Sequence, residues 1–313
     1  MVKDMKNHLI GVDIGGTSIK IGIFDFEGRL INKWDIPTNK LNHGEDILHD
    51  IYNSILERTS FDDVFGIGFG VPGPVSNEIA LNCVNLGWNN KHLVEDFRKI
   101  LSDENMIIRL ANDANCACAG EVFQGSAKGF QNVAMFTLGT GVGGGILQNG
   151  TIVEGVNGLG GEPGHIVVDF LHKFPCNCGK KGCLETVSSA TGIVNLAKEK
   201  LTKTKRQSAL RNFANFSAKR VFDLAKQGDQ LSIDVIDEAA NYLAYAMSMI
   251  ALTTNPELFV IGGGVSNAGE YLLNKIKDHF YSYVNPFIRD QKIVIASLGN
   301  DAGIYGAAYM VKP

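Results

Sequence analysis

A histidine and three cysteines stand close together in the chain, and side chains of these types can bind a metal ion together. They are His165, Cys176, Cys178 and Cys183. Three thiolates and one imidazole are the ligand set of a closed structural zinc site, which leaves no position open for a substrate. Proline and glycine residues around the cysteines favour tight turns that let the thiolates converge. The spacing predicts bound Zn²⁺; buried free thiols and a disulfide are the alternatives.

Two glutamates, Glu162 and Glu185, stand on either side of this cluster. A metal that fixes the segment between them would also fix two carboxylates, which are strong hydrogen-bond acceptors. We therefore expect the metal to hold a rigid binding site rather than to take part in chemistry.

Glycine-rich loops occur twice in the same setting, between two apolar strands. The first copy covers residues 8–26, with Gly15, Gly16 and Thr17 in its loop, and the second covers residues 132–150. Such loops can hold a phosphate through backbone amides and a hydroxyl, although a single Gly-Gly-Thr is better explained as a hairpin turn. The repeat implies two similar halves with a nucleotide in the cleft between them.

Two aspartates lie where strands end. Asp13 ends the first strand and is a candidate to hold Mg²⁺ through water. Asp113 follows a short apolar strand at residues 106–110 and precedes a helical pattern. An aspartate at such a junction is usually a helix N-cap, which is the prediction from local sequence alone, but it can also be a general base because ligands collect at the carboxyl ends of strands.

Two further turns can present backbone to a ligand. The run Gly262–Gly264 follows a strand and lets the backbone approach a flat group such as adenine, whereas Gly73, between two prolines, fits a ligand contact and a plain structural turn equally well. The polar and aromatic segment 85–90 is a candidate pocket loop.

Composition limits the class of protein. A chain of 313 residues suggests two domains, and 29 basic against 33 acidic side chains indicate no general affinity for nucleic acid or anionic membranes. No apolar run reaches the length of a membrane span, and the first nine residues lack the apolar core of a signal peptide, so we expect a cytoplasmic protein with a small partner. Cys83, Cys116 and Cys118 are expected to be reduced core residues.

Hydrophobic periodicity predicts the elements that position these residues. Strands are expected at 8–14, 18–26, 29–36, 64–75, 106–110, 257–262 and 292–298, and helices at 43–59, 114–125, 188–201, 217–229, 231–255, from about 270, and at 301–311. The helix at 231–255 is apolar on most faces and should be buried, the small residues of 301–311 suit close packing, and the basic stretch 203–216 is expected to be a solvated connector.

Taken together and in order, these segments resemble the ROK family of sugar kinases, in its branch of bacterial glucokinases of the Gram-positive type. The matching segments are GVDIGGTSIK, NDAN, LGTGVGGGI, GEPGH, CNCGKKGCLE, VIGGGVSNAG and LGNDAG, which run from near residue 8 to near residue 310. The resemblance implies a duplicated α/β fold of the actin-like ATPase (ribonuclease H-like) type with two domains and a cleft between them. The small domain would comprise 1–112 plus 300–313, and the large domain 113–299 with the zinc loop.

The resemblance also implies roles for individual residues. Asp113 would be the catalytic base, and His165 would bind zinc through one ring nitrogen and the sugar through the other. The implied sugar-binding residues are Gly73, Asn112, Glu162, His165 and Glu185. The implied ATP- and Mg²⁺-binding residues are Asp13, Gly15, Gly16, Thr17, Lys20, Gly139, Thr140, Gly141, Gly262, Gly263 and Gly264. Pro163 departs from the family, where an apolar residue such as isoleucine is more usual, and should stiffen the sugar loop.

The expected activity is phosphorylation of glucose at its 6-hydroxyl by ATP, in a homodimer or homotetramer. Kinases for fructose, mannose, N-acetylmannosamine or N-acetylglucosamine are the nearest alternatives, since the same motifs serve several hexoses. A sugar-sensing transcriptional regulator is disfavoured because the first strand begins near residue 8 and leaves no room for a helix-turn-helix module. A catalytically inactive sugar-binding module is disfavoured because Asp113 and the glycine loops are intact.

Overall fold

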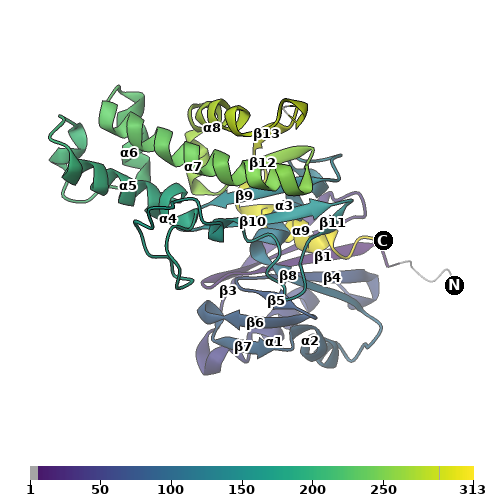
Figure 1. The fold of residues 1–313 in the computed structure, drawn as a ribbon. Helices are drawn as coiled ribbons and strands as arrows, with labels where there is room; N and C mark the ends of the chain where they lie inside the picture. Colours follow the sequence, from purple (N-terminus) through teal and green to yellow (C-terminus); the bar gives the residue numbers. More distant parts are fainter. Residues whose placement is uncertain (1–5, 289) are drawn as a thin grey trace.

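Two five-stranded sheets form the centre of the protein, and they repeat one topology (Figure 1). The computed structural model describes residues 6–288 and 290–313. The strand orders are β3-β2-β1-β4-β8 and β11-β10-β9-β12-β13. In chain order, the first three strands of each sheet pair antiparallel with their neighbours. The fourth and fifth strands run parallel to the first strand. The predicted duplication into two α/β halves is confirmed.

The first sheet is covered on both faces, which explains why its central strands are almost continuously apolar. Its strands are β1 (His8–Ile14), β2 (Ser18–Phe24), β3 (Leu30–Pro37), β4 (Val64–Val71) and β8 (Ile107–Asn112). Alternate residues of β1, such as Ile10 and Val12, pack in one core with helices α1 (Ile47–Leu56) and α2 (Leu93–Leu101). Leu9, on the other face, packs with Ile304 of α9 (Ala302–Tyr309).

The second sheet is covered in the same way. It contains β9 (Val133–Leu138), β10 (Val142–Gln148), β11 (Thr151–Ile152), β12 (Leu258–Gly262) and β13 (Lys292–Ile295). One face packs in a core with α5 (Ala190–Lys203), α6 (Ala218–Lys226), α7 (Gln230–Thr254) and α8 (Glu270–Tyr283), and α3 (Asp113–Gln124) contributes to the core on the other face. The long helix α7 is largely buried, as its sequence predicted.

Helices α3 and α9 lie against each other between the two sheets (Figure 1). A Cβ atom on Gly120 would overlap the carbonyl group of Ala302, and one on Gly306 would overlap that of Cys116, so the two backbones touch directly. The predicted close packing of the last helix is confirmed. Helix α3 follows a strand of the first sheet and packs on the second, while α9 follows a strand of the second sheet and packs on the first. The chain therefore crosses twice between the halves.

Smaller elements correct two predictions. Residues 85–90 do line cavities, as predicted, but they are not simply a loop. Trp88 begins a strand and is buried, and its indole N–H donates to the Gly44 carbonyl at 3.1 Å. The stretch 203–216 is not wholly solvated, because Leu210 is buried in the core of the second half. The remaining elements are β5 (Val75–Ser76), β6 (Ile79–Cys83), β7 (Trp88–Lys91), α4 (Glu185–Ser188), and the 3₁₀ turns Leu41–Gly44, Phe61–Asp63, Val84–Leu86, Pro163–His165, Ala209–Asn212, Gly264–Ala268, Pro286–Ile288 and Gly299–Asp301.

Cys83, Cys116 and Cys118 are buried free thiols, as predicted. None of the helices in the described ranges is both long and apolar enough to traverse a bilayer.

Candidate active site and metal cluster

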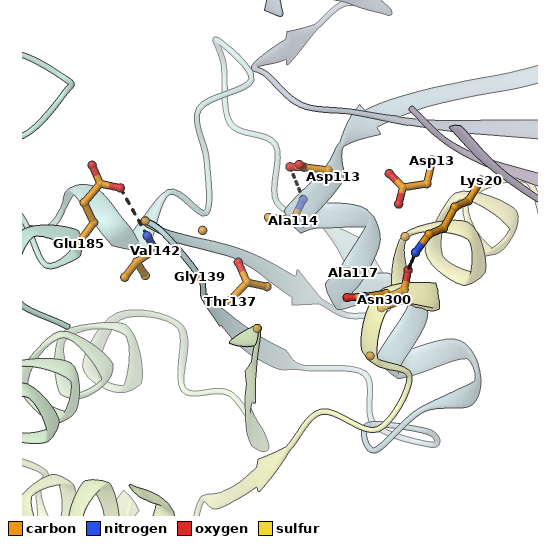
Figure 2. A pocket seen from close by; sticks show the side chains of 16 residues that line it. Asp13, Lys20, Asp113, Ala114, Ala117, Thr137, Gly139, Val142, Glu185 and Asn300 are labelled. Atoms are coloured by element: carbon orange, nitrogen blue, oxygen red, sulfur yellow. Dashed lines mark hydrogen bonds between the residues drawn. The ribbon is translucent and has the colours of Figure 1, made fainter. Parts of the chain in front are cut away.

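A cavity of about 540 Å³ lies between the two halves and receives residues from both. In Figure 2, Glu185 stands on one side of this cavity, Asp13 and Lys20 stand on the opposite side, and Asp113 and Thr137 lie between them. The residues proposed for function that line it are Asp13, Lys20, Asp113, Gly139, Gly141, Glu185 and Gly263.

Asp113 is presented to the cavity by the start of α3. The side-chain oxygen of Asn112 accepts a hydrogen bond from the Ala114 N–H at 2.9 Å, so Asn112, and not Asp113, is the N-cap. The capping role predicted for Asp113 from local sequence is therefore wrong. Its carboxylate accepts from the same N–H at 2.8 Å (Figure 2) and otherwise faces the cavity. Burial raises the pKa of Asp113, and the hydrogen bond from Ala114 partly offsets this.

Asp13 stands across the cavity beside a lysine. It pairs in register with Lys20 of the neighbouring strand, and the Lys20 Nζ donates to the Asn300 carbonyl at 2.5 Å. Burial, followed by repulsion from Asp113, raises the pKa of Asp13 to about 6, while Lys20 acts in the opposite direction. Two carboxylates that repel each other across a cavity favour a divalent cation between them, and the lysine supplies a positive charge for phosphate.

Backbone from two glycine turns forms part of the cavity wall. Gly139 and Gly141 come from the β9–β10 loop, and Gly263 follows β12. Gly263 has a φ of +81°, and a Cβ atom there would overlap the backbone of Leu138. Glycine at this position therefore lets two strand ends approach each other. In the described part of the chain, Thr140, Gly262 and Gly264 are not among the residues that line the cavity.

The first glycine loop faces a neighbouring cavity of about 670 Å³. Gly16 and Thr17 line it together with Lys40, His43 and Asn85. Gly15 lines neither this cavity nor the central one among the described residues; its carbonyl accepts from the Thr38 hydroxyl at 2.7 Å. The structure thus brings the second glycine loop to Asp113 and leaves the first in a separate hollow.

The predicted sugar-binding residues form two groups, one beside Asp113 (Gly73 and Asn112) and one at the histidine–cysteine cluster (Glu162, His165 and Glu185). The Asn112 Nδ2 donates to the Gly73 carbonyl at 3.2 Å, which joins these two residues beside Asp113. Glu162 lies just before the turn Pro163–His165, and its pKa is raised by burial and by the charges of Asp113 and Glu185, while His165 lowers it. Glu185 lines the central cavity, whereas the other four residues are not among its described lining residues.

The histidine and three cysteines of the predicted metal site converge. Their ligand atoms all lie within 4.8 Å of one another. The Cys176 Sγ is 3.6 Å from the His165 Nδ1, and the Cys178 Sγ is 3.7 Å from the Cys183 Sγ. Two sulfurs each about 2.3 Å from a tetrahedral zinc lie about 3.7 Å apart, so the donor set fits this metal.

Glu185 connects this cluster to the cavity. One carboxylate oxygen accepts from the Cys176 thiol at 3.1 Å, and the other accepts from the Val142 N–H at 3.4 Å (Figure 2). A Cβ atom on Gly141 would overlap this second oxygen, so glycine leaves the space that the glutamate occupies. Glu185 therefore contacts the metal cluster and the cavity at the same time.

Several cavity residues have no counterpart in the predicted set, notably Thr137, Asn300 and Gly303. Thr137 precedes Gly139 by two residues, as Asp13 precedes Gly15, so aligning the two repeats would have identified it. Asn300 and Gly303 stand in the segment LGNDAG, which matches the family but carries no local signal for an individual role.

The duplicated sheet topology, with a cavity between the halves lined by carboxylates and glycine loops, defines a protein of the actin-like ATPase fold. The chain belongs to the ROK family, which it matches over residues 9–313.

The similarity to known proteins extends over nearly the whole chain. A glucokinase from Halalkalibacterium halodurans is 42% identical over 97% of this chain and 94% of its own length. A glucokinase from Thermotoga maritima is 35% identical, with 98% of each chain covered. The solved structure of a ROK family glucokinase from Streptomyces griseus in complex with glucose and AMPPNP is 30% identical, has a TM-score of 0.74, and covers 97% of this chain and 98% of its own.

Proposed function

We propose that this protein transfers the γ-phosphoryl group of ATP to the 6-hydroxyl of glucose. The observation that carries the proposal is Asp113, which faces a cavity built from both halves and shares it with Asp13 and Lys20. The similarity to three glucokinases supports glucose as the acceptor. A kinase for another hexose, such as fructose, mannose or N-acetylmannosamine, is the alternative, since carboxylates and amides recognise many polyols.

The residues of the cavity suit this reaction because a sugar hydroxyl is a poor nucleophile. Asp113 accepts the proton of the hydroxyl as it attacks phosphorus, which requires an ionised carboxylate. Mg²⁺, when held through Asp13, offsets the charge of the phosphates. Lys20 and the backbone of Gly139, Gly141 and Gly263, which line the cavity, stabilise the nucleotide. The other predicted nucleotide-binding residues lie outside this lining in the structure and would reach the nucleotide on closure of the halves; they are Gly15, Gly16, Thr17, Thr140, Gly262 and Gly264.

The sugar is oriented by Gly73, Asn112, Glu162, His165 and Glu185. The Nδ1 atom of His165 is directed to Cys176, which leaves Nε2 to donate to a sugar oxygen. Zn²⁺ bound by the histidine and the three cysteines fixes this tautomer and the loop that carries Glu162 and Glu185. These two acceptors then penalise a sugar whose hydroxyls do not pair with them.

We further infer the organisation of the protein around this reaction. Residues 1–112 with 300–313 form one domain and 113–299 the other, a division supported by the packing of α9 on the first sheet and of α3 on the second. The protein acts in the cytoplasm as a homodimer or homotetramer, and sedimentation analysis would test the assembly.

A coupled assay of ADP release across a panel of hexoses tests the proposed function. We expect the highest kcat/KM with glucose, and magnesium chelation should abolish turnover. A clearly higher value with another hexose would overturn the choice of glucose. The absence of ADP release with every hexose, by protein that still binds ATP, would overturn the kinase itself.

A further inference from the structure

Glu121 is a carboxylate with no solvent exposure, and it lies on the same helix as Asp113. It accepts five hydrogen bonds. The N–H and hydroxyl of Ser126 donate at 2.7 and 3.0 Å, those of Ser297 at 2.9 and 3.2 Å, and the Leu298 N–H at 2.8 Å. Burying a carboxylate is costly unless charge-assisted hydrogen bonds replace its water, so this set of donors is what allows Glu121 to remain inside.

The donors come from two segments that are far apart in sequence. Ser126 belongs to the turn that ends α3, whereas Ser297 and Leu298 follow β13. A Cβ atom on Gly125 would overlap the Glu121 carboxylate, so glycine there gives the side chain its room. Glu121 thus joins the helix that carries Asp113 to a segment that begins 176 positions further along the chain.

The joined segment leads directly into the wall of the active-site cavity. Gly299 and Asn300, which line the cavity, are the next two residues after Leu298. The first sheet holds the segment from the other side, through the bond from Lys20 to the Asn300 carbonyl at 2.5 Å and the Lys33–Asp301 ion pair at 2.7 Å. Segment 297–301 is therefore bonded to α3 on one side and to the first sheet on the other.

We propose that Glu121 is a positioning residue that sets the place of segment 297–300, and hence of the bound nucleotide, relative to the Asp113 base. The inference rests on the proposed function, since it assigns this part of the cavity to ATP. Asp113 and Glu121 are eight residues apart on one helix, about 12 Å along its axis, so the helix acts as a rigid spacer. Glu162, Asn112 and Glu185 are held by other contacts, so the sugar site should not depend on Glu121.

The first test compares Glu121→Gln with Glu257→Gln. Glu257 is a control for the hydrogen bonding, although it is exposed where Glu121 is buried: it also accepts several hydrogen bonds across the fold, from the Gln131 and Asn132 N–H groups at 3.0 and 2.9 Å, without contacting the cavity segment. The amide of Glu121→Gln has one accepting oxygen instead of two and no charge, so the N–H groups of Ser126 and of the segment cannot all keep their bonds, and those that remain are weaker. We expect KM for ATP, and Kd for a non-hydrolysable analogue measured by calorimetry, to rise about ten-fold, with KM for glucose nearly unchanged.

In Glu257→Gln, both KM values and the analogue Kd should stay near those of the wild type. Equal changes in KM for ATP and for glucose in Glu121→Gln, or no change in either, would overturn the proposal. So would an equal weakening of nucleotide binding in the Glu257 variant.

A milder pair of variants covers the case in which Glu121→Gln does not fold. The Ser126 and Ser297 hydroxyls both donate to the Oε2 atom of Glu121, one from the turn and one from the cavity segment. Ser297→Ala should weaken analogue binding more than Ser126→Ala at a similar loss of thermal stability, and equal binding would refute the proposal. Calorimetry distinguishes failure of the Glu121 proposal from failure of the proposed function. If the wild-type protein binds ATP but phosphorylates no hexose, the kinase activity is overturned and the role of Glu121 in nucleotide binding can still be tested.

Discussion

Asp113 is both the first residue of helix α3 and part of the cavity wall. It is the first residue of a helix whose cap is supplied by Asn112, so its own carboxylate is left to face the cavity. Replacing it with Asn keeps an oxygen for the Ala114 N–H but removes the ability to take a proton. We expect kcat to fall on the order of 10²–10⁴-fold, with glucose binding still measurable by calorimetry. A near-normal kcat would exclude Asp113 as the base.

The pH dependence of turnover tests the same residue by its charge. Burial raises the pKa of Asp113 above the ordinary value of 3.8, and a general base works only when ionised. The kcat/KM for glucose, at saturating ATP and magnesium, should therefore fall as the pH is lowered through a value above 3.8. A pH profile that stays flat down to pH 4 would contradict this assignment.

The same shift has a consequence for folding. Because the folded-state pKa of Asp113 lies above the unfolded one, its contribution to stability is lost as the pH rises through the folded pKa. The melting temperature of Asp113→Asn should exceed that of the wild type at pH 7, and the difference should shrink towards pH 4. Calorimetric scans at both values check this; a lower melting temperature for the variant at pH 7 would contradict it.

At the scale of elements, the loop that carries the histidine and cysteines couples the metal cluster to the sugar site. Glu185 follows the ligand Cys183 by two residues and lines the cavity, so loss of the metal should disorder the carboxylate as well as the loop. Cys178→Ser should lower zinc content, melting temperature and glucose affinity together. Cys118→Ala, which removes a buried thiol in another part of the core, should lower only the melting temperature. Unchanged glucose affinity in Cys178→Ser would break the proposed link.

The elements themselves were largely predictable, because apolar periodicity and glycine turns are local signals. The repeat of strand, glycine loop and strand predicted the duplication that the two sheets display. Features set by distant partners were not predictable. Strand β13 ends at Ile295, and the Ala296 N–H still bonds to the Ile261 carbonyl of β12, but the N–H groups of Ser297 and Leu298, which were expected to extend the strand, bond to Glu121 instead. The placement of Gly16 and Thr17 in a separate hollow likewise depends on how the halves meet, which short motifs do not encode.

At the scale of the whole molecule, the two halves are joined where the chain crosses between them. One crossing is the junction of Asn112 with Asp113, and the other is the segment from β13 to α9. Both crossings carry active-site residues, so a rotation of one half on the other would move Asp113 and the nucleotide segment together. In the structure, the loop with Gly16 and Thr17 and the cavity with Asp113 belong to two separate hollows, which is an open arrangement for a site expected to use both.

Closure on sugar binding is therefore the expected large-scale motion, since it would exclude water from the phosphoryl donor. Small-angle scattering should show a smaller radius of gyration at saturating glucose than without sugar. L-glucose, matched in size and composition, is the control and should leave the curve unchanged. The Asp113→Asn variant should still close, because it keeps the sugar contacts and loses only the proton acceptor. A scattering curve that glucose does not alter, in protein shown by calorimetry to bind it, would mean that the two halves are already fixed in their working arrangement.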